Sequence, residues 1–176
     1  IDAGKGFDTH AHRNMEIITI PLKGKVKHKD SAGHEGEIAF GEVQVMSAGS
    51  GVYHSEFNAS SQEKLELLQI WIQPKLLNIK PRYEQKKISF EEKNKIITFV
   101  TPRKEKDKLL INQEAWLSMA RVEEGSIVEY ELNDVENGVY CFVIEGKVEI
   151  LGEILILRDA IGVRGIGLVE IKGSSE

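Results

Sequence analysis

The sequence predicts an all-β protein that contains two β-barrel domains in tandem. Short runs rich in Ile, Val and aromatic residues recur along the 176-residue chain, separated by Gly, Asp, Asn and Ser at intervals of about ten residues. Part of the first half is repeated in the second half, and no long amphipathic helix is evident. This combination is typical of antiparallel sandwiches and barrels built from two copies of one unit.

The expected strands fall into two groups. Those of the first half are MEIITIPL, GKVKHKD, GEIAF, EVQVMSA and LELLQIWI, and those of the second half are IITFVTP, AWLSMARV, SIVEYEL, VYCFVIEGKVEIL and EILILRDAIGV. The tract DSAGHEG at 30–36 has the composition of a hairpin turn.

Two blocks carry the repeat. ITIPLKGKV, which ends at Val26, is similar to CFVIEGKV, which ends at Val148. GEVQVMSAGSGV, which starts at Gly41, is similar to GEILILRDAIGV, which starts at Gly152. The predicted organisation is a first domain at 1–77, a polar linker at 78–95 and a second domain at 96–176. Because the sequence opens and closes in what reads as β structure, we expect both ends to be incomplete.

Composition excludes several classes of function. The net charge is -5 and the charged residues are interspersed, so no basic stripe is available to neutralise nucleic-acid phosphates. The single cysteine, Cys141, lies in an apolar run, which excludes a disulfide framework and fits a reducing compartment. No apolar run reaches the roughly 18 residues of a membrane span. We therefore expect a cytoplasmic protein that binds neither nucleic acid nor membrane.

Two pairs of residues have the spacing of metal ligands. His10 and His12 lie two residues apart in FDTHAHRNMEI, and His54 and Glu56 have the same spacing in GVYHSEFN. Residues i and i+2 of a strand point to the same face. If the two segments are neighbours in a barrel, three imidazoles and one carboxylate converge on one point. This donor set suits a transition metal and leaves coordination positions vacant for chemistry.

The repeat serves as an internal control for this interpretation. An H-x-H pair occurs by chance in some proteins, and a lone histidine is more often a hydrogen-bonded structural residue than a ligand. In the second copy, the blocks align the first pair with Leu132 and Asp134 and the second pair with Gly165 and Gly167. All four polar side chains are absent together, as expected if they serve one purpose.

Other polar residues receive weaker interpretations. We expect Glu16, four residues after His12, to lie on the same strand face, as a fifth ligand or, preferably, as an acceptor that fixes an imidazole. We expect His28 and His34, which flank the KDSAG turn, to face solvent. Candidate pocket-lining residues are Met46, Phe57 and Trp71.

The first domain resembles the pirin family of bicupins. The resemblance rests on H-x-H-(x3)-E followed by M-S-A-G-x-G-(x2)-H-S-E, with LQIWIQP and PRYEQ downstream. It matches the first cupin motif at Gly4, His10, His12, Glu16 and Gly24, and the second at Gly41, Gly49, His54 and Asn58. It implies two tandem cupin (jelly-roll-like) barrels. It also implies one metal ion, usually iron, held by His10, His12, His54 and Glu56, and a C-terminal cupin that binds none.

The resemblance implies two classes of function. Bacterial pirins are similar to quercetin 2,3-dioxygenases, which open a flavonol ring with O2 and release carbon monoxide, whereas animal pirins are described as nuclear, iron-dependent co-regulators of transcription factors. We favour the dioxygenase. A ferrous ion with one carboxylate gives a ligand shell of charge +1, which attracts a flavonol enolate, and Glu56 would be both ligand and catalytic base.

Alternatives remain open at this stage. The iron could act as a redox switch that alters binding to a transcription-related protein partner. The fold also hosts metal-dependent isomerases and small-molecule binding proteins. The donor set suits Fe(II), and it also accepts Ni, Cu, Mn or Zn.

Overall fold

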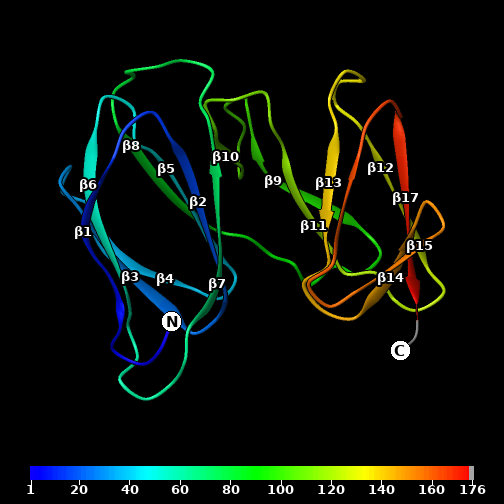
Figure 1. The fold of residues 1–176 in the computed structure, drawn as a ribbon, viewed down its shortest axis with the longest axis horizontal. Helices are drawn as coiled ribbons and strands as arrows, with labels where there is room; N and C mark the ends of the chain where they lie inside the picture. Colours follow the sequence, from blue (N-terminus) through cyan, green and yellow to red (C-terminus); the bar gives the residue numbers. More distant parts are fainter. Residues whose placement is uncertain (175–176) are drawn as a thin grey trace. The chain divides into compact units, whose positions relative to one another are not determined.

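The computed structural model describes residues 1–174, which form strands, turns and loops without a helix (Figure 1). The predicted all-β class is confirmed. The chain divides into two compact units: unit 1 comprises Ile1–Ser89 and Thr98–Leu117, and unit 2 comprises Phe90–Ile97 and Ser118–Glu176. No helix among the described residues is long and apolar enough to span a membrane.

Unit 1 contains two four-stranded sheets whose paired strands are antiparallel. The first sheet has the order β1 (Gly6–His12), β6 (Val52–Asn58), β3 (Lys25–Asp30) and β4 (Glu35–Ala39). The second has the order β7 (Glu66–Ile72), β2 (Glu16–Lys23), β5 (Glu42–Ser47) and β8 (Arg82–Lys87). The chain crosses repeatedly between the two sheets, with β3–β4 and β7–β8 as the consecutive pairs that stay in one sheet, and this gives the jelly-roll-like barrel seen in Figure 1.

Burial along the strands follows from what covers each face. β3 and β6 alternate between buried and open positions, as expected for a sheet with one face toward the interior. β2 and β5 are buried at nearly every position. Their outer side is covered by the segment that contains β10 (Leu109–Leu110), which contacts β5 and β8 and pairs in parallel with β9 (Ile96–Thr101). Burial on both faces explains why these two strands read as continuous apolar runs.

The boundaries of the units differ from the predicted domains at 1–77 and 96–176. β8 lies inside the predicted linker at 78–95 and pairs with β5 along its whole length. Its polar composition is that of an edge strand, because charged side chains protect an edge from pairing with other chains. Residues 98–117, predicted as part of the second domain, belong to unit 1.

Unit 2 repeats the topology of the first unit with shorter strands. Its larger sheet has the order β12 (Ile127–Glu131), β17 (Leu168–Ser174), β14 (Lys147–Ile150) and β15 (Glu153–Ile156), and β13 (Val139–Phe142) pairs with β16 (Ala160–Val163). β11 (Leu117–Ala120) precedes these strands at the division between the units. By strand order, β12 corresponds to β1, β17 to β6 and β15 to β4.

The topology supports the repeat but changes its alignment. GEVQVM forms β5, whereas GEILI forms β15, the counterpart of β4, so the predicted matches of His54 with Gly165 and of Glu56 with Gly167 are wrong. Paired residues in β12 and β17, such as Tyr130 and Val169, instead occupy the place of the β1–β6 pair. They belong to an apolar core built on Leu132, Val143, Ile150, Leu155 and Val169. The interior of unit 2 is therefore apolar.

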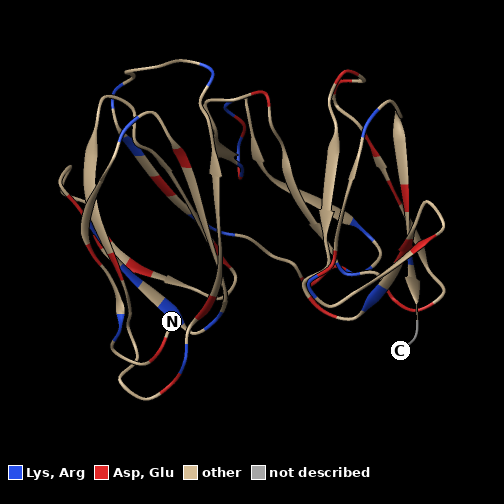
Figure 2. Cartoon of the chain, viewed as in Figure 1, with Lys and Arg blue, Asp and Glu red and all other residues tan. Residues whose placement is uncertain are grey.

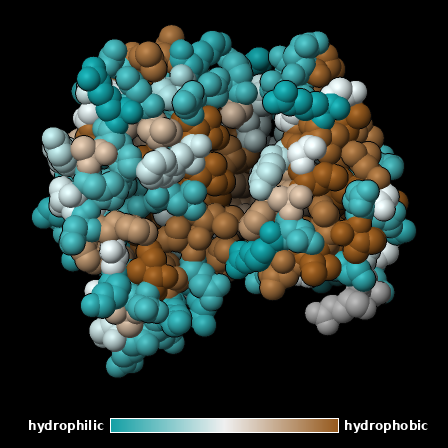
Figure 3. Space-filling model, in the orientation of Figure 1, coloured by the Kyte–Doolittle hydropathy of each residue, from teal (hydrophilic) through white to brown (hydrophobic). Residues whose placement is uncertain are grey.

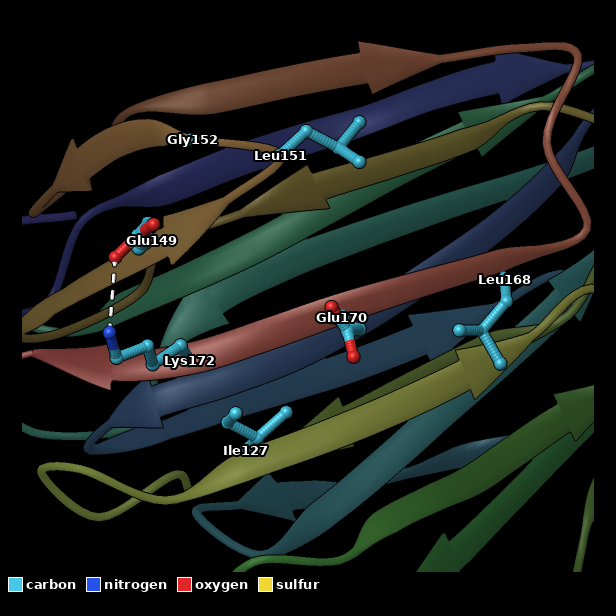
Figure 4. Close-up of a pocket in the computed structure, with 7 residues that line it drawn as sticks. All are labelled: Ile127, Glu149, Leu151, Gly152, Leu168, Glu170 and Lys172. Atoms are coloured by element: carbon cyan, nitrogen blue, oxygen red, sulfur yellow. Dashed lines mark ion pairs between the residues drawn. The ribbon is translucent and has the colours of Figure 1, made fainter.

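The surface is mixed in charge and partly apolar. Lysine and arginine alternate with aspartate and glutamate over both units (Figure 2). Unit 2 exposes several large apolar side chains: Leu151, Ile154, Ile156 and Leu157. Figure 3 shows apolar areas, in brown, among the hydrophilic ones on the face that it displays. A shallow pocket of about 240 Å³ on its larger sheet contains the ion pair between Glu149 and Lys172, whose charged atoms are 3.5 Å apart (Figure 4). The pocket is lined by Ile127, Glu149, Leu151, Gly152, Leu168, Glu170 and Lys172.

Glu16 has a structural position that the sequence did not predict. The backbone takes a left-handed conformation at Asn14 (φ 51°), between the end of β1 and the start of β2, so Glu16 does not continue the face of His12. Its fully buried carboxylate accepts hydrogen bonds from Ser47 Oγ at 2.8 Å and from the backbone N–H of Asn112 at 3.1 Å. Glu16 therefore joins β2 and β5 to the segment that covers them, and it belongs to neither of the two groups of potential metal ligands found among the described residues.

We expect Glu16→Ala to lower the free energy of unfolding by about 1–3 kcal/mol, because it leaves a buried hydroxyl and a backbone N–H without an acceptor. Urea denaturation followed by circular dichroism measures this change. Glu37→Ala is the matched control, since this exposed side chain forms only a surface ion pair with Lys25. Equal stability of the two variants would contradict the role given to Glu16.

Candidate metal centre

The pairing of β1 with β6 brings three imidazoles together. His10 lies directly opposite His54, and His12 follows two residues later on the same strand. The ring centroids are 4.8 Å apart for His10 and His12, 4.5 Å for His10 and His54, and 4.9 Å for His12 and His54. One ligand nitrogen from each residue lies within 4.8 Å of the others. His54 is fully buried, while His10 and His12 are partly exposed.

Glu56, the fourth predicted ligand, lies deeper in the barrel beside His54. It is also fully buried, and it forms a second group of ligand-type atoms with His54 and His28. Its Oε1 accepts hydrogen bonds from Thr19 Oγ1 at 3.2 Å and from Gln44 Nε2 at 3.5 Å, and its Oε2 accepts one from Gln69 Nε2 at 2.5 Å. The opposite sheet thus surrounds the carboxylate with donors.

The expectation that His28 faces solvent is wrong. His28 lies opposite Glu56 in the β3–β6 pair and is fully buried. Its Nδ1 is 4.0 Å from Glu56 Oε1, and its Nε2 is 3.4 Å from Asp30 Oδ2. The sequence does contain a signal for this position: in VKHKD the period of two places His28 on the face of the buried Val26, with lysines on the other face.

His34 is partly exposed, as expected for a residue of the β3–β4 turn, but it has specific partners. Its Nδ1 is 2.8 Å from Asp30 Oδ2, and its ring stacks on Tyr83 at a centroid distance of 4.9 Å. Asp30 Oδ1 also accepts hydrogen bonds from the backbone N–H groups of Ala32 and His34. Burial acts to raise the pKa of Asp30, but these hydrogen bonds outweigh it and hold the pKa below its usual value. The aspartate therefore fixes the turn.

The tautomer of His10 is set by its backbone contact. Its Nδ1 is 2.7 Å from the carbonyl oxygen of Asp8, which can only accept, so Nδ1 carries the hydrogen. The Nε2 of His10 then presents a lone pair, and it lies 3.1 Å from the Nε2 of His54. An acceptor oriented in this way toward two other histidines is what a metal ligand requires.

Burial controls the charge state of the cluster. Burial, together with the neighbouring histidines, lowers the pKa of His54 to about 4 against the opposing effect of Glu56. Burial and His10 lower the pKa of His12. Burial acts to raise the pKa of Glu56, but the nearby imidazoles of His28 and His54 and the hydrogen bond from Gln69 outweigh it and lower the pKa overall. At neutral pH His12 and His54 are therefore neutral, and Glu56 is ionised.

These residues fit a transition-metal ion. His12 Nε2 and His54 Nδ1 are buried nitrogens without a hydrogen-bond partner among the described residues, which is costly unless something binds there. Neutral imidazoles with a nearby carboxylate are the donors that first-row divalent metals prefer. In the described part of unit 2, no group of three histidine, cysteine or carboxylate side chains lies close enough to hold an ion.

The three candidate pocket-lining residues have different environments. Trp71 is half exposed at the site, where its ring meets that of His12 edge to face at 4.9 Å. Met46 is buried in an apolar cluster with Ile17, so it contributes to the core. Phe57 is adjacent to the inward-facing Glu56 in β6 and so belongs to the opposite face of the strand.

Comparisons with known proteins agree with this architecture. The Pirin family profile matches residues 1–72, and the profile of the quercetinase C-terminal cupin domain matches residues 98–176. A quercetin 2,3-dioxygenase of Escherichia coli K12 is 35% identical over 176 residues, which cover 100% of this chain and 75% of that protein. The predicted fold of two tandem cupins is thereby confirmed.

Solved structures give the same result. The nickel(II) complex of the bacterial pirin YhhW from Escherichia coli superimposes with a TM-score of 0.92 at 34% identity, covering 100% of this chain and 75% of that one. A quercetin 2,3-dioxygenase from Acinetobacter baumannii has a TM-score of 0.76 at 24% identity over 98% of this chain and 65% of its own, which supports the fold alone.

The lowered pKa values predict that the metal-free protein loses stability in acid. The unfolded chain binds protons at histidine near pH 6.5, whereas folded His54 does so only near pH 4. The unfolded state therefore binds more protons between these values, and the free energy of unfolding falls as the pH drops from about 6.5 to about 4. Because the pKa of Glu56 is lowered from its ordinary value of 4.5, the loss of stability continues as the pH falls below 4.5.

Thermal unfolding of chelator-treated protein across this pH range measures the effect. We expect a flatter pH dependence for His54→Gln than for the parent, whereas His34→Gln, at the turn, should change the dependence much less. If the melting temperatures of the parent and of His54→Gln depended on pH in the same way, the assignment of the acid sensitivity to His54 would be contradicted.

Proposed function

Since the chain belongs to the pirin family, we propose that it is a metal-dependent dioxygenase that opens the ring of a flavonol-like substrate with O2. The observation that carries the proposal is the gathering of the partly exposed His10 and His12 with the buried His54, beside which lies the buried Glu56 carboxylate. We assign the ligand set to these four residues and the ion to Fe(II). Nickel, copper, manganese and zinc suit the same donors.

The protein residues would have distinct roles in this reaction. The bound ion would supply Lewis acidity and redox capacity. The ionised carboxylate lowers the formal charge of the site below that of the bare cation, and neutral imidazoles leave that charge unchanged, so an anionic enolate would still be attracted. Glu56 would accept the proton of the acidic substrate hydroxyl at a carboxylate oxygen. Thr19, Gln44 and Gln69 hold that oxygen pair in place, so the base is oriented before substrate arrives.

A test of the activity uses protein loaded with Fe(II) without oxygen, then given quercetin and air. We expect carbon monoxide in proportion to the quercetin consumed, and metal analysis should give one ion per chain. His54→Ala should lose both the metal and the carbon monoxide. His34→Ala is the matched control, because His34 lies outside both groups of ligand-type atoms, and it should retain both. A fully loaded protein that forms no more carbon monoxide than His54→Ala would overturn the dioxygenase proposal.

The role of Glu56 as a base predicts a large effect of Glu56→Gln. The amide keeps the size of the side chain but cannot take the proton, so we expect ring opening to slow by about 10²–10⁴-fold. Rates are compared per bound metal ion, which separates loss of the base from loss of the ligand. A per-metal rate within a few-fold of the parent would show that another group accepts the proton.

A further inference from the structure

Trp71 combines wide exposure with a fixed orientation. It lies on β7, the edge strand of the second sheet, where it pairs with Ile17 of β2. The residue is 53% exposed, and it is absent from the three apolar core clusters built on Leu132, on Ile17 and on Val26 in the described part of the chain. Its indole Nε1 nevertheless donates a hydrogen bond to Gln69 Oε1 at 3.0 Å, and its ring contacts His12 at an interplanar angle of 83°. The indole is thus held from two sides while much of its surface stays open.

Gln69 links this indole to the buried carboxylate. Gln69 lies two residues before Trp71, on the same face of β7, and opposite Thr19. Its Oε1 accepts from the indole, and its Nε2 donates to Glu56 Oε2 at 2.5 Å. Since an indole can only donate and an ionised carboxylate can only accept, the two contacts determine which end of the amide is oxygen. The amide therefore has one orientation that serves both neighbours.

We infer that Trp71 is a stacking platform for a planar aromatic ring of the substrate, and that Gln69 is a positioning residue which fixes the indole relative to Glu56. The inference rests on the proposed function and specifies its substrate as a flat polyphenol. A half-exposed tryptophan has apolar surface to bury, and preorganised contacts reduce the entropy lost on binding. Its contact with His12 places a stacked ring beside the imidazole cluster.

Tyr53 provides a matched control for Trp71. It is an aromatic residue with a similar exposed fraction of 58%, and it lies next to His54 in β6. Because it alternates with the inward-facing His54, its side chain belongs to the outer face of that strand. A general contribution of exposed aromatic residues to polyphenol binding would therefore affect both positions, whereas the platform affects only Trp71.

Anaerobic titration of Fe(II)-loaded protein with quercetin measures binding without turnover. We expect Trp71→Ala to weaken binding by about 10-fold or more, Trp71→Phe by less than about 3-fold, and Tyr53→Ala not at all. Equal affinities of Trp71→Ala and the parent overturn the platform, as does an equal loss in Tyr53→Ala or a parent that binds no quercetin. Circular dichroism and metal content verify that each variant is folded and loaded.

The role of Gln69 has a spectroscopic readout that is independent of activity. In a Trp116→Phe background, Trp71 is the remaining tryptophan of the chain. Gln69→Met keeps the length of the side chain and removes both hydrogen bonds, so we expect a larger amplitude of fast depolarisation in time-resolved anisotropy. Unchanged anisotropy overturns the positioning role.

Failure of this inference is distinguishable from failure of the proposed function. If Trp71→Ala binds quercetin weakly and the parent forms no carbon monoxide, the platform stands and the dioxygenase proposal fails. If the parent forms carbon monoxide and Trp71→Ala binds quercetin as the parent does, the platform alone fails.

Discussion

The register of β6 with its two neighbouring strands determines the whole site. On one side β6 pairs with β1, which places His10 opposite His54, and on the other it pairs with β3, which places His28 opposite Glu56. Side chains alternate with a period of two, so a slip of one residue in either pairing would turn half of these groups toward solvent. The same register buries His54 fully, and that burial keeps its imidazole neutral at physiological pH. Geometry and electrostatics of the cluster thus have a single origin.

Burial of so many polar groups requires hydrogen bonds from elsewhere in the barrel. The second sheet supplies them through Thr19, Gln44 and Gln69, each of which donates to Glu56. A buried carboxylate without such partners would be protonated or would destabilise the fold. The two amides and the hydroxyl therefore keep the buried Glu56 carboxylate ionised and hydrogen-bonded, which the imidazoles alone would not do. The polar interior is a property of both sheets.

Much of the site could be predicted from the sequence, because strand periodicity is local. The spacing of His10 with His12 and of His54 with Glu56 was sufficient to predict their shared faces. Glu16 was misplaced because the left-handed backbone at Asn14 ends one strand and starts another, a change that breaks the period. The predicted linker at 78–95 includes β8, because the polar composition of an edge strand is similar to that of a linker. The hydrogen bonds of Gln69 depend on pairing between distant strands, which one sequence does not reveal.

The second unit shows which features the fold itself needs. It closes the same strand order around an apolar core, with Tyr130 and Val169 paired where the first unit pairs His10 with His54. The topology therefore does not require polar residues in the interior. Burying them in the first unit destabilises the fold, so their presence there needs a reason other than folding. Comparison of the two barrels thus separates the residues that the fold requires from those to which we assign the metal site. The second group consists of the histidines, Glu56 and the side chains that hold them.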